Sequence, residues 1–224
     1  MTLKVLVIAV HPDDETLGCG GTLLRHRNEG DSIYWCIVTE PSKEAGCSAE
    51  HIRARNIEIE RVAQMYEFSS VTRLGVSAGR VGEKPLISLV AAFSDVLSSI
   101  QPDILYLPFL YDVHSDHRYC FNAVISASKS FRQPSVQKIL MMETQSETEF
   151  AVGVAGQAFV PNHFVDITKY LQQKLSIAKI YSTEFSQHPF PRSQQNIESL
   201  AVIRGATSGC FHAEAFQLIK EIRR

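Results

Sequence analysis

Two short polar segments contain the residue types that bind metal ions and move protons. The first is residues 11–15 (HPDDE), and the second is residues 112–117 (DVHSDH). A catalytic zinc ion is commonly held by three side chains that combine histidine with a carboxylate, and its fourth position stays open for water. These segments offer such a set in His11, Asp14 and His117. They therefore predict a metal site that activates water.

Three further side chains of the same segments are suited to proton transfer beside such a metal. Asp13, His114 and Asp116 are candidates for a general base, a general acid and a group that orients a ligand. The alternative is an ordinary structural role, because acidic residues after a strand often cap the next helix and a His-x-Asp-His loop can simply face solvent. The occurrence of both segments directly after predicted strands favours the functional interpretation.

The elements around these segments alternate between strand-like and helix-like patterns. Strands are predicted at 4–10, 32–38, 71–74, 104–107, 137–142 and 164–167, and helices at 16–29, 48–68, 85–100, 117–130, 169–184, 194–203 and 213–223. This alternation predicts an α/β layered fold with a mainly parallel sheet, and the lack of a linker or an internal repeat predicts one domain over 1–224. Because ligands bind at the carboxyl ends of parallel strands, both polar segments are expected at one edge of the sheet.

The composition excludes several classes of protein. The 22 Lys and Arg residues against 24 Asp and Glu residues give a net charge of −2, without the basic excess typical of nucleic-acid-binding proteins. The sequence shows neither an apolar run of about 18–20 residues that could span a membrane nor a signal-peptide pattern. Its five cysteines are scattered without a CxxC motif, which favours reduced thiols. We therefore expect a cytoplasmic protein that binds no nucleic acid and has no transmembrane segment.

The two polar segments, together with residues 18–21 (GCGG), resemble the PIG-L/LmbE family of zinc-dependent N-acetyl amino-sugar deacetylases. Supporting matches lie at residues 55–58 (RNIE), 159–162 (FVPN), 164–167 (FVDI) and 213–216 (AEAF). The resemblance implies a Rossmann-like three-layer fold and hydrolysis of an N-acetylated amino sugar, of the N-acetylglucosamine type and either free or conjugated, to acetate and a free amine. It implies Zn²⁺ as the cofactor, replaceable in the cell by Fe²⁺, Co²⁺ or Mn²⁺.

The resemblance also implies a role for each matching residue. The three metal ligands would be His11, Asp14 and His117. Asp13 would be the base that activates water, and Asp116 would orient a neighbouring histidine. His114, in its protonated form, would stabilise the oxyanion and protonate the leaving amine. Some relatives have a tyrosine where this chain has Asp112, so oxyanion binding assisted by a tyrosine is not expected at that position.

Substrate contacts are predicted outside the two polar segments. Arg55, in the match to the second helix of the family, is one candidate, with Arg53 as the alternative. His188 and Arg192 lie in the irregular second half of the chain, which is expected to wall the pocket, and Arg192 would meet a phosphate if the sugar carries one. The glycine-rich segment 18–21 comes eight residues after Val10, too far from the strand for a dinucleotide-binding loop, and predicts close packing of a helix.

Two other functions remain open at this point. Sets of two histidines and one carboxylate also hold iron in non-haem oxygenases. A non-enzymatic sugar- or nucleotide-binding module on the same fold is the second alternative, since a fold alone does not fix a function. The sequence also leaves the oligomeric state open, and a homo-oligomer would be ordinary.

Overall fold

A seven-stranded sheet forms the centre of the computed structural model, which describes residues 2–154 and 156–223. The strands are β1 (Lys4–Ala9), β2 (Ser32–Glu40), β3 (Ser70–Ser77), β4 (Ile104–Leu107), β5 (Lys138–Met142), β6 (His163–Asp166) and β7 (Ala213–Glu221). The helices are α1 (Asp14–Asn28), α2 (Ala49–Tyr66), α3 (Leu86–Ile100), α4 (Ser115–Ala127), α5 (Leu171–Ala178) and α6 (Gln194–Ser208), with a 3₁₀ turn at Val81–Glu83. The strand order is β3-β2-β1-β4-β5-β7-β6.

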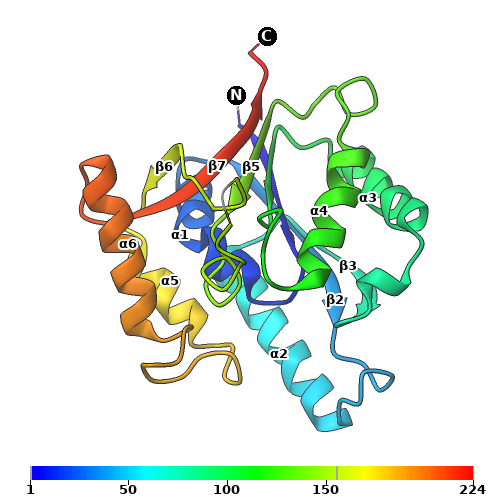
Figure 1. Ribbon diagram of the computed structural model, residues 1–224, viewed down its shortest axis with the longest axis horizontal. Helices are drawn as coiled ribbons and strands as arrows, with labels where there is room; N and C mark the ends of the chain where they lie inside the picture. Colours follow the sequence, from blue (N-terminus) through cyan, green and yellow to red (C-terminus); the bar gives the residue numbers. More distant parts are fainter. Residues whose placement is uncertain (1, 155, 224) are drawn as a thin grey trace.

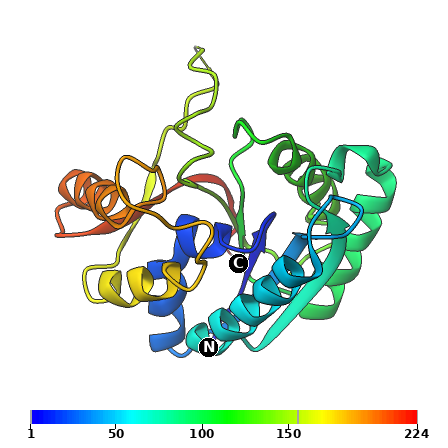
Figure 2. The same cartoon turned by 90° about the horizontal axis from the view of Figure 1, so that it is seen from below.

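The sheet is mainly parallel, as the alternation of elements predicts. Strands β1 to β5 pair in parallel, and only β7 runs antiparallel to its neighbours β5 and β6. Helices cover both faces (Figures 1 and 2), which gives the three-layer α/β architecture. Among the described residues, no helix is long and apolar enough to cross a membrane.

Strand β1 shows why the sheet is buried on both faces. Its alternate side chains Val5, Val7 and Ala9 pack with residues of α1 and α2, whereas those of Leu6 and Ile8 pack with residues of α3 and α4. Successive side chains of a strand point to opposite faces. An unbroken apolar run therefore supplies two hydrophobic cores at once.

Helix α1, which begins at the first polar segment, is broken in its middle by non-helical backbone at Cys19. A buried ion pair satisfies the backbone groups that the break exposes. The Glu214 carboxylate accepts hydrogen bonds from the amides of Gly21 and Thr22 at 2.8 and 2.7 Å. The Lys174 ammonium lies 2.7 Å from this carboxylate and donates to the Leu17 carbonyl at 2.9 Å. The pair thus fixes both halves of α1 against α5 and β7.

The glycine-rich segment 18–21 packs closely, as predicted. An added Cβ at Gly18 would lie 2.9 Å from Met142 of β5, and one at Gly21 would lie 2.7 Å from Ile167. Distances this short require the neighbour to move, so the glycines allow α1 to approach the sheet and the segment after β6.

The prediction of a helix at 213–223 is wrong, because this segment forms strand β7. It lies between β5 and β6 and hydrogen-bonds to both, so its backbone is satisfied on two sides by partners that are distant in sequence. This tertiary pairing outweighs the local preference of residues such as Ala213 and Ala215. The helix predicted at 169–184 is shorter, ending at Ala178.

Candidate metal centre

Both polar segments lie at the carboxyl ends of neighbouring parallel strands. His11 follows β1 after Val10, and Asp14 is the first residue of α1. His117 lies in the first turn of α4, which follows the loop after β4. Since β1 and β4 are paired in parallel, their carboxyl ends bring these three residues to one edge of the sheet. Residues more than a hundred positions apart therefore meet.

The three predicted ligands converge within the range that a zinc ion requires. Asp14 Oδ2 lies 3.3 Å from His117 Nε2 and 3.9 Å from His11 Nδ1, and the two histidine nitrogens lie 3.3 Å apart. Ligand atoms about 2.0–2.1 Å from a tetrahedral zinc ion are separated by about 3.3–3.4 Å. Among the described residues, these three form one of the groups able to hold a metal ion. Their donor types and spacing fit zinc.

Asp112 is a functional candidate that the sequence interpretation missed. Its carboxylate accepts from His117 Nδ1 at 2.8 Å and from the Thr148 hydroxyl at 2.7 Å, and both Asp112 and His117 are fully buried. A carboxylate on the second nitrogen of a ligating histidine fixes its tautomer and leaves the other nitrogen free for a metal. Burial lowers the pKa of His117, but Asp14 and Asp112 outweigh this and hold it well above its ordinary value. The sequence offered one signal for this role, namely that the Asp112 carboxylate precedes His117 by five residues.

We expect Asp112→Asn to weaken metal binding without removing any ligand. An amide oxygen accepts a weaker hydrogen bond from His117 Nδ1 than a carboxylate does. The His117 ring is therefore held less firmly in its orientation. The expected loss is about 10- to 100-fold in zinc affinity, measured by competition with a chromophoric chelator. Affinity equal to that of the wild type would show that Asp112 does not support the ligand.

Asp13 is held in a conformation that few residues adopt. Its φ is 144°, and its amide donates to the buried Glu15 carboxylate at 3.1 Å. Strained backbone of this kind is concentrated at functional sites. Burial and the charge of Asp14 raise the pKa of Asp13 to about 7, although Arg192 opposes the shift. A carboxylate with this pKa is matched to accepting a proton near neutral pH.

Two arginines predicted to contact substrate are engaged with the protein around Asp13. Arg192 Nη1 donates to Asp13 Oδ2 at 2.6 Å and lies 3.0 Å from Glu184. Arg55 is buried, donates to the Pro12 carbonyl at 3.1 Å and pairs with the same Glu184. Glu184 thus joins both guanidinium groups into one charged network that borders Asp13.

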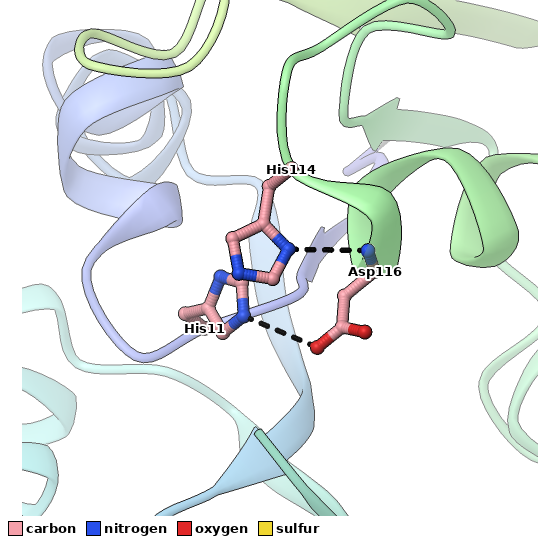
Figure 3. Close-up of side chains that lie close together, drawn as sticks. All are labelled: His11, His114 and Asp116. Atoms are coloured by element: carbon pink, nitrogen blue, oxygen red, sulfur yellow. Dashed lines mark hydrogen bonds and ion pairs between the residues drawn. The ribbon is translucent and has the colours of Figure 1, made fainter. Parts of the chain in front are cut away.

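His114 and Asp116 lie against His11 (Figure 3). His114 Nδ1 accepts from the Asp116 amide at 3.1 Å, so the proton of a neutral ring resides on Nε2. Burial, together with His11, lowers the pKa of His114 to about 4. The lowered pKa favours a neutral ring, whereas the role predicted from the sequence is that of a protonated His114; this role stays a prediction. A neutral ring remains a hydrogen-bond donor through Nε2.

Asp116 acts on His11 from the side away from Asp14. Its Oδ2 lies 3.5 Å from His11 Nε2 (Figure 3), and its carboxylate accepts from the amides of Gly79 and Val81 at 2.7 and 3.2 Å. His11, His114 and Asp116 are also close enough to share a metal. With both of its oxygens bonded to backbone amides, Asp116 also fits the predicted role of orienting a histidine.

A cavity of about 270 Å³ opens beside the candidate ligands. His11, Asp13, Asp14 and His114 line it, and so do the two arginines of the network. Residues that the sequence did not single out complete the wall, among them Thr39, His51, Gln145, Ser146 and Glu184. This volume lies close to the lower end of the range of about 300–1,000 Å³ that is typical of small-molecule sites.

His188, the remaining predicted substrate contact, lies elsewhere. Its side chain is exposed and lines a separate surface hollow with Phe185 and Gln194. Its contact with substrate stays a prediction, as do the contacts of Arg55 and Arg192.

Comparison with known proteins shows the family. The family described as PIG-L, GlcNAc-PI de-N-acetylase, matches residues 6–128, which is more than half of the chain and includes both polar segments. The chain belongs to the PIG-L family. The sequence is 25% identical to diacetylchitobiose deacetylase from Thermococcus kodakarensis over 229 residues, covering 98% of this chain and 84% of the relative.

Solved structures show the same fold in proteins with different chemistry. N,N'-diacetylchitobiose deacetylase from Pyrococcus horikoshii, complexed with its inhibitor MPG, superimposes with a TM-score of 0.77 at 22% identity, covering 97% of this chain and 84% of its own. GalB, the 4-carboxy-2-hydroxymuconate hydratase from Pseudomonas putida KT2440, gives 0.75 at 17% identity, covering 100% of this chain and 98% of its own. Likenesses at these identities establish the fold, and the function must be argued from the site.

Proposed function

We propose that this protein is a metal-dependent hydrolase that removes the acetyl group from an N-acetylated amino sugar, releasing acetate and a free amine. The observation that carries the proposal is the convergence of His11 Nδ1, Asp14 Oδ2 and His117 Nε2 beside the strained Asp13. Family membership and the similarity to a diacetylchitobiose deacetylase support the substrate class.

The chain's own residues divide the work of amide hydrolysis. Zn²⁺ bound by the three ligands would polarise the acetyl carbonyl and lower the pKa of water to about 7. Asp13 accepts a proton from the attacking water through its carboxylate, and Arg192 holds that carboxylate in place at 2.6 Å. The neutral His114 presents Nε2–H to the oxygen on which negative charge develops, where one such donor is worth a few kcal/mol. The proton taken by Asp13 is available to the leaving amine.

Metal content and acetate release together test this proposal. Wild-type protein reconstituted with Zn²⁺ is expected to hold about one ion per chain and to release acetate from N-acetylglucosamine or N,N'-diacetylchitobiose. Asp14→Ala is expected to lose both properties, because two ligands cannot hold the ion. Asp95→Ala, which changes an exposed aspartate of α3, is the matched control and should behave as the wild type.

Each contrary result would point to a different function. Wild-type protein that holds no metal after reconstitution would exclude the hydrolase and favour a sugar- or nucleotide-binding module. Bound metal without acetate release from a broad set of N-acetyl sugars would exclude the proposed substrate class. Dioxygen consumption by the iron-loaded protein would indicate the oxygenase chemistry of the same ligand set.

A further inference from the structure

The turn after β5 concentrates buried polar atoms that have no partner. Five such atoms belong to four consecutive residues: Thr144 Oγ1, Gln145 Nε2 and Oε1, Ser146 Oγ and Glu147 Oε2. Buried polar side-chain atoms in proteins are nearly always hydrogen-bonded, and leaving one unpaired costs free energy. Two of these four residues, Gln145 and Ser146, line the cavity beside the candidate ligands. A molecule bound there is one source of the missing hydrogen bonds.

Gln145 is the most pronounced case. Its side chain is 3% exposed, neither polar atom of its carboxamide has a partner among the described residues, and it lines the cavity that also contains His11, Asp14 and His114. A carboxamide both donates and accepts hydrogen bonds and carries no charge. It therefore suits a neutral hydroxyl or amide group of a ligand.

The turn is fixed to the metal centre rather than free to relax. The amides of Glu147 and Thr148 donate to the Thr144 carbonyl at 3.1 and 2.9 Å. The Thr148 hydroxyl donates to Asp112, the residue that supports His117. Ser146 has a φ of 70°, which is rare for a non-glycine residue. These hydrogen bonds restrain the backbone around Gln145 and so fix its position relative to the candidate ligands.

We propose that Gln145 is a specificity-determining residue that hydrogen-bonds a hydroxyl or acetamido group of the sugar, with the Ser146 hydroxyl as its neighbour in the same contact. The inference rests on the proposed deacetylase function and names one of its substrate-binding residues. Sites that hydrogen-bond a substrate group discriminate strongly against analogues lacking that group, because the protein atoms are then left unpaired. Both polar atoms of the Gln145 side chain would be left unpaired in this way.

The competing explanation is a buried water molecule. Gln145 also lines a second, much smaller cavity of about 10 Å³, together with Lys174, Glu214 and Arg204. This volume is close to the minimum that holds one water. If such a water satisfied the carboxamide, Gln145 would matter for stability and not for substrate.

Gln145→Met separates the two explanations, because methionine keeps the length of the side chain and removes its hydrogen bonds. We expect kcat/KM for N,N'-diacetylchitobiose to fall about 10- to 100-fold through KM. The wild type should prefer N-acetylglucosamine over the monodeoxy analogue that lacks the hydroxyl bound by Gln145. We expect Gln145→Met to lose this preference. Gln145→Asn, which keeps a carboxamide on a shorter side chain, should retain part of that preference.

Zinc content and melting temperature, measured on the same samples, distinguish a loss of substrate binding from a loss of metal or of stability. Both should match the wild type in Gln145→Met. Gln217→Leu is the matched control, since Gln217 Oε1 is also buried without a partner but lines neither cavity, and its kinetics should not change. A lower melting temperature with unchanged kinetics and discrimination in Gln145→Met would overturn the inference in favour of the water. A wild type that holds zinc but releases no acetate would instead reject the deacetylase function itself.

Discussion

Asp13→Asn is expected to lower kcat by about 10²- to 10⁴-fold while the protein keeps its metal. The substitution removes the carboxylate that we propose accepts the proton of the attacking water. It leaves all three metal ligands in place, because Asp13 Oδ2 bonds to Arg192 and not to a ligand. Asparagine has the same size and shape as aspartate, so the change adds no steric conflict to the strained backbone at this position. Acetate release and zinc content of the same preparation measure the two properties separately.

The control for this variant is a substitution of Asp95, an exposed aspartate of α3. Asp95→Asn makes the same chemical change far from the cavity and should leave kcat unaltered. Turnover by Asp13→Asn within a few-fold of the wild type would assign the base to another residue. Loss of zinc together with turnover would mean that Asp13 acts through the metal site and not as the base.

The largest effect on folding is expected from Glu214→Gln. The change leaves the Lys174 ammonium without its counter-charge in a buried site where both side chains are 5% exposed. Breaking one partner of a buried ion pair reduces the free energy of unfolding by about 3–5 kcal/mol. For a chain of this size that corresponds to a fall in melting temperature of roughly 6–20 °C. Thermal and chemical denaturation measure it.

Part of this effect comes from the break in α1, because the Glu214 carboxylate accepts from the amides of Gly21 and Thr22. The more accessible pair of Lys138 and Glu221, whose side chains are 24% and 40% exposed, offers a matched control. Glu221→Gln is expected to change the melting temperature very little, since exposed ion pairs contribute little to stability. A melting temperature for Glu214→Gln equal to that control would show that the buried pair does not hold the helix.

The sequence alone determined the class of fold and the residues of the candidate metal centre. The apolar run at residues 4–10 is typical of a strand buried on both faces, and a polar segment directly after such a strand is expected at the edge where parallel sheets bind ligands. The ligand set His11, Asp14 and His117 could be proposed because its residue types are those that hold zinc, and the structure brings these side chains together. Local pattern and side-chain chemistry suffice for such conclusions.

Only the tertiary structure decided which groups act on those residues. Arg192 reaches Asp13 across 179 positions of sequence, and Gln145 enters the cavity from a turn whose sequence carries no motif. The segment at 213–223 becomes a strand because β5 and β6 offer it hydrogen bonds from both sides. These outcomes depend on which distant segments meet and on what burial does to each polar group. Such contacts depend on how the whole chain packs. The sequence pattern reflects only the conformational preferences of residues that are close together in the sequence.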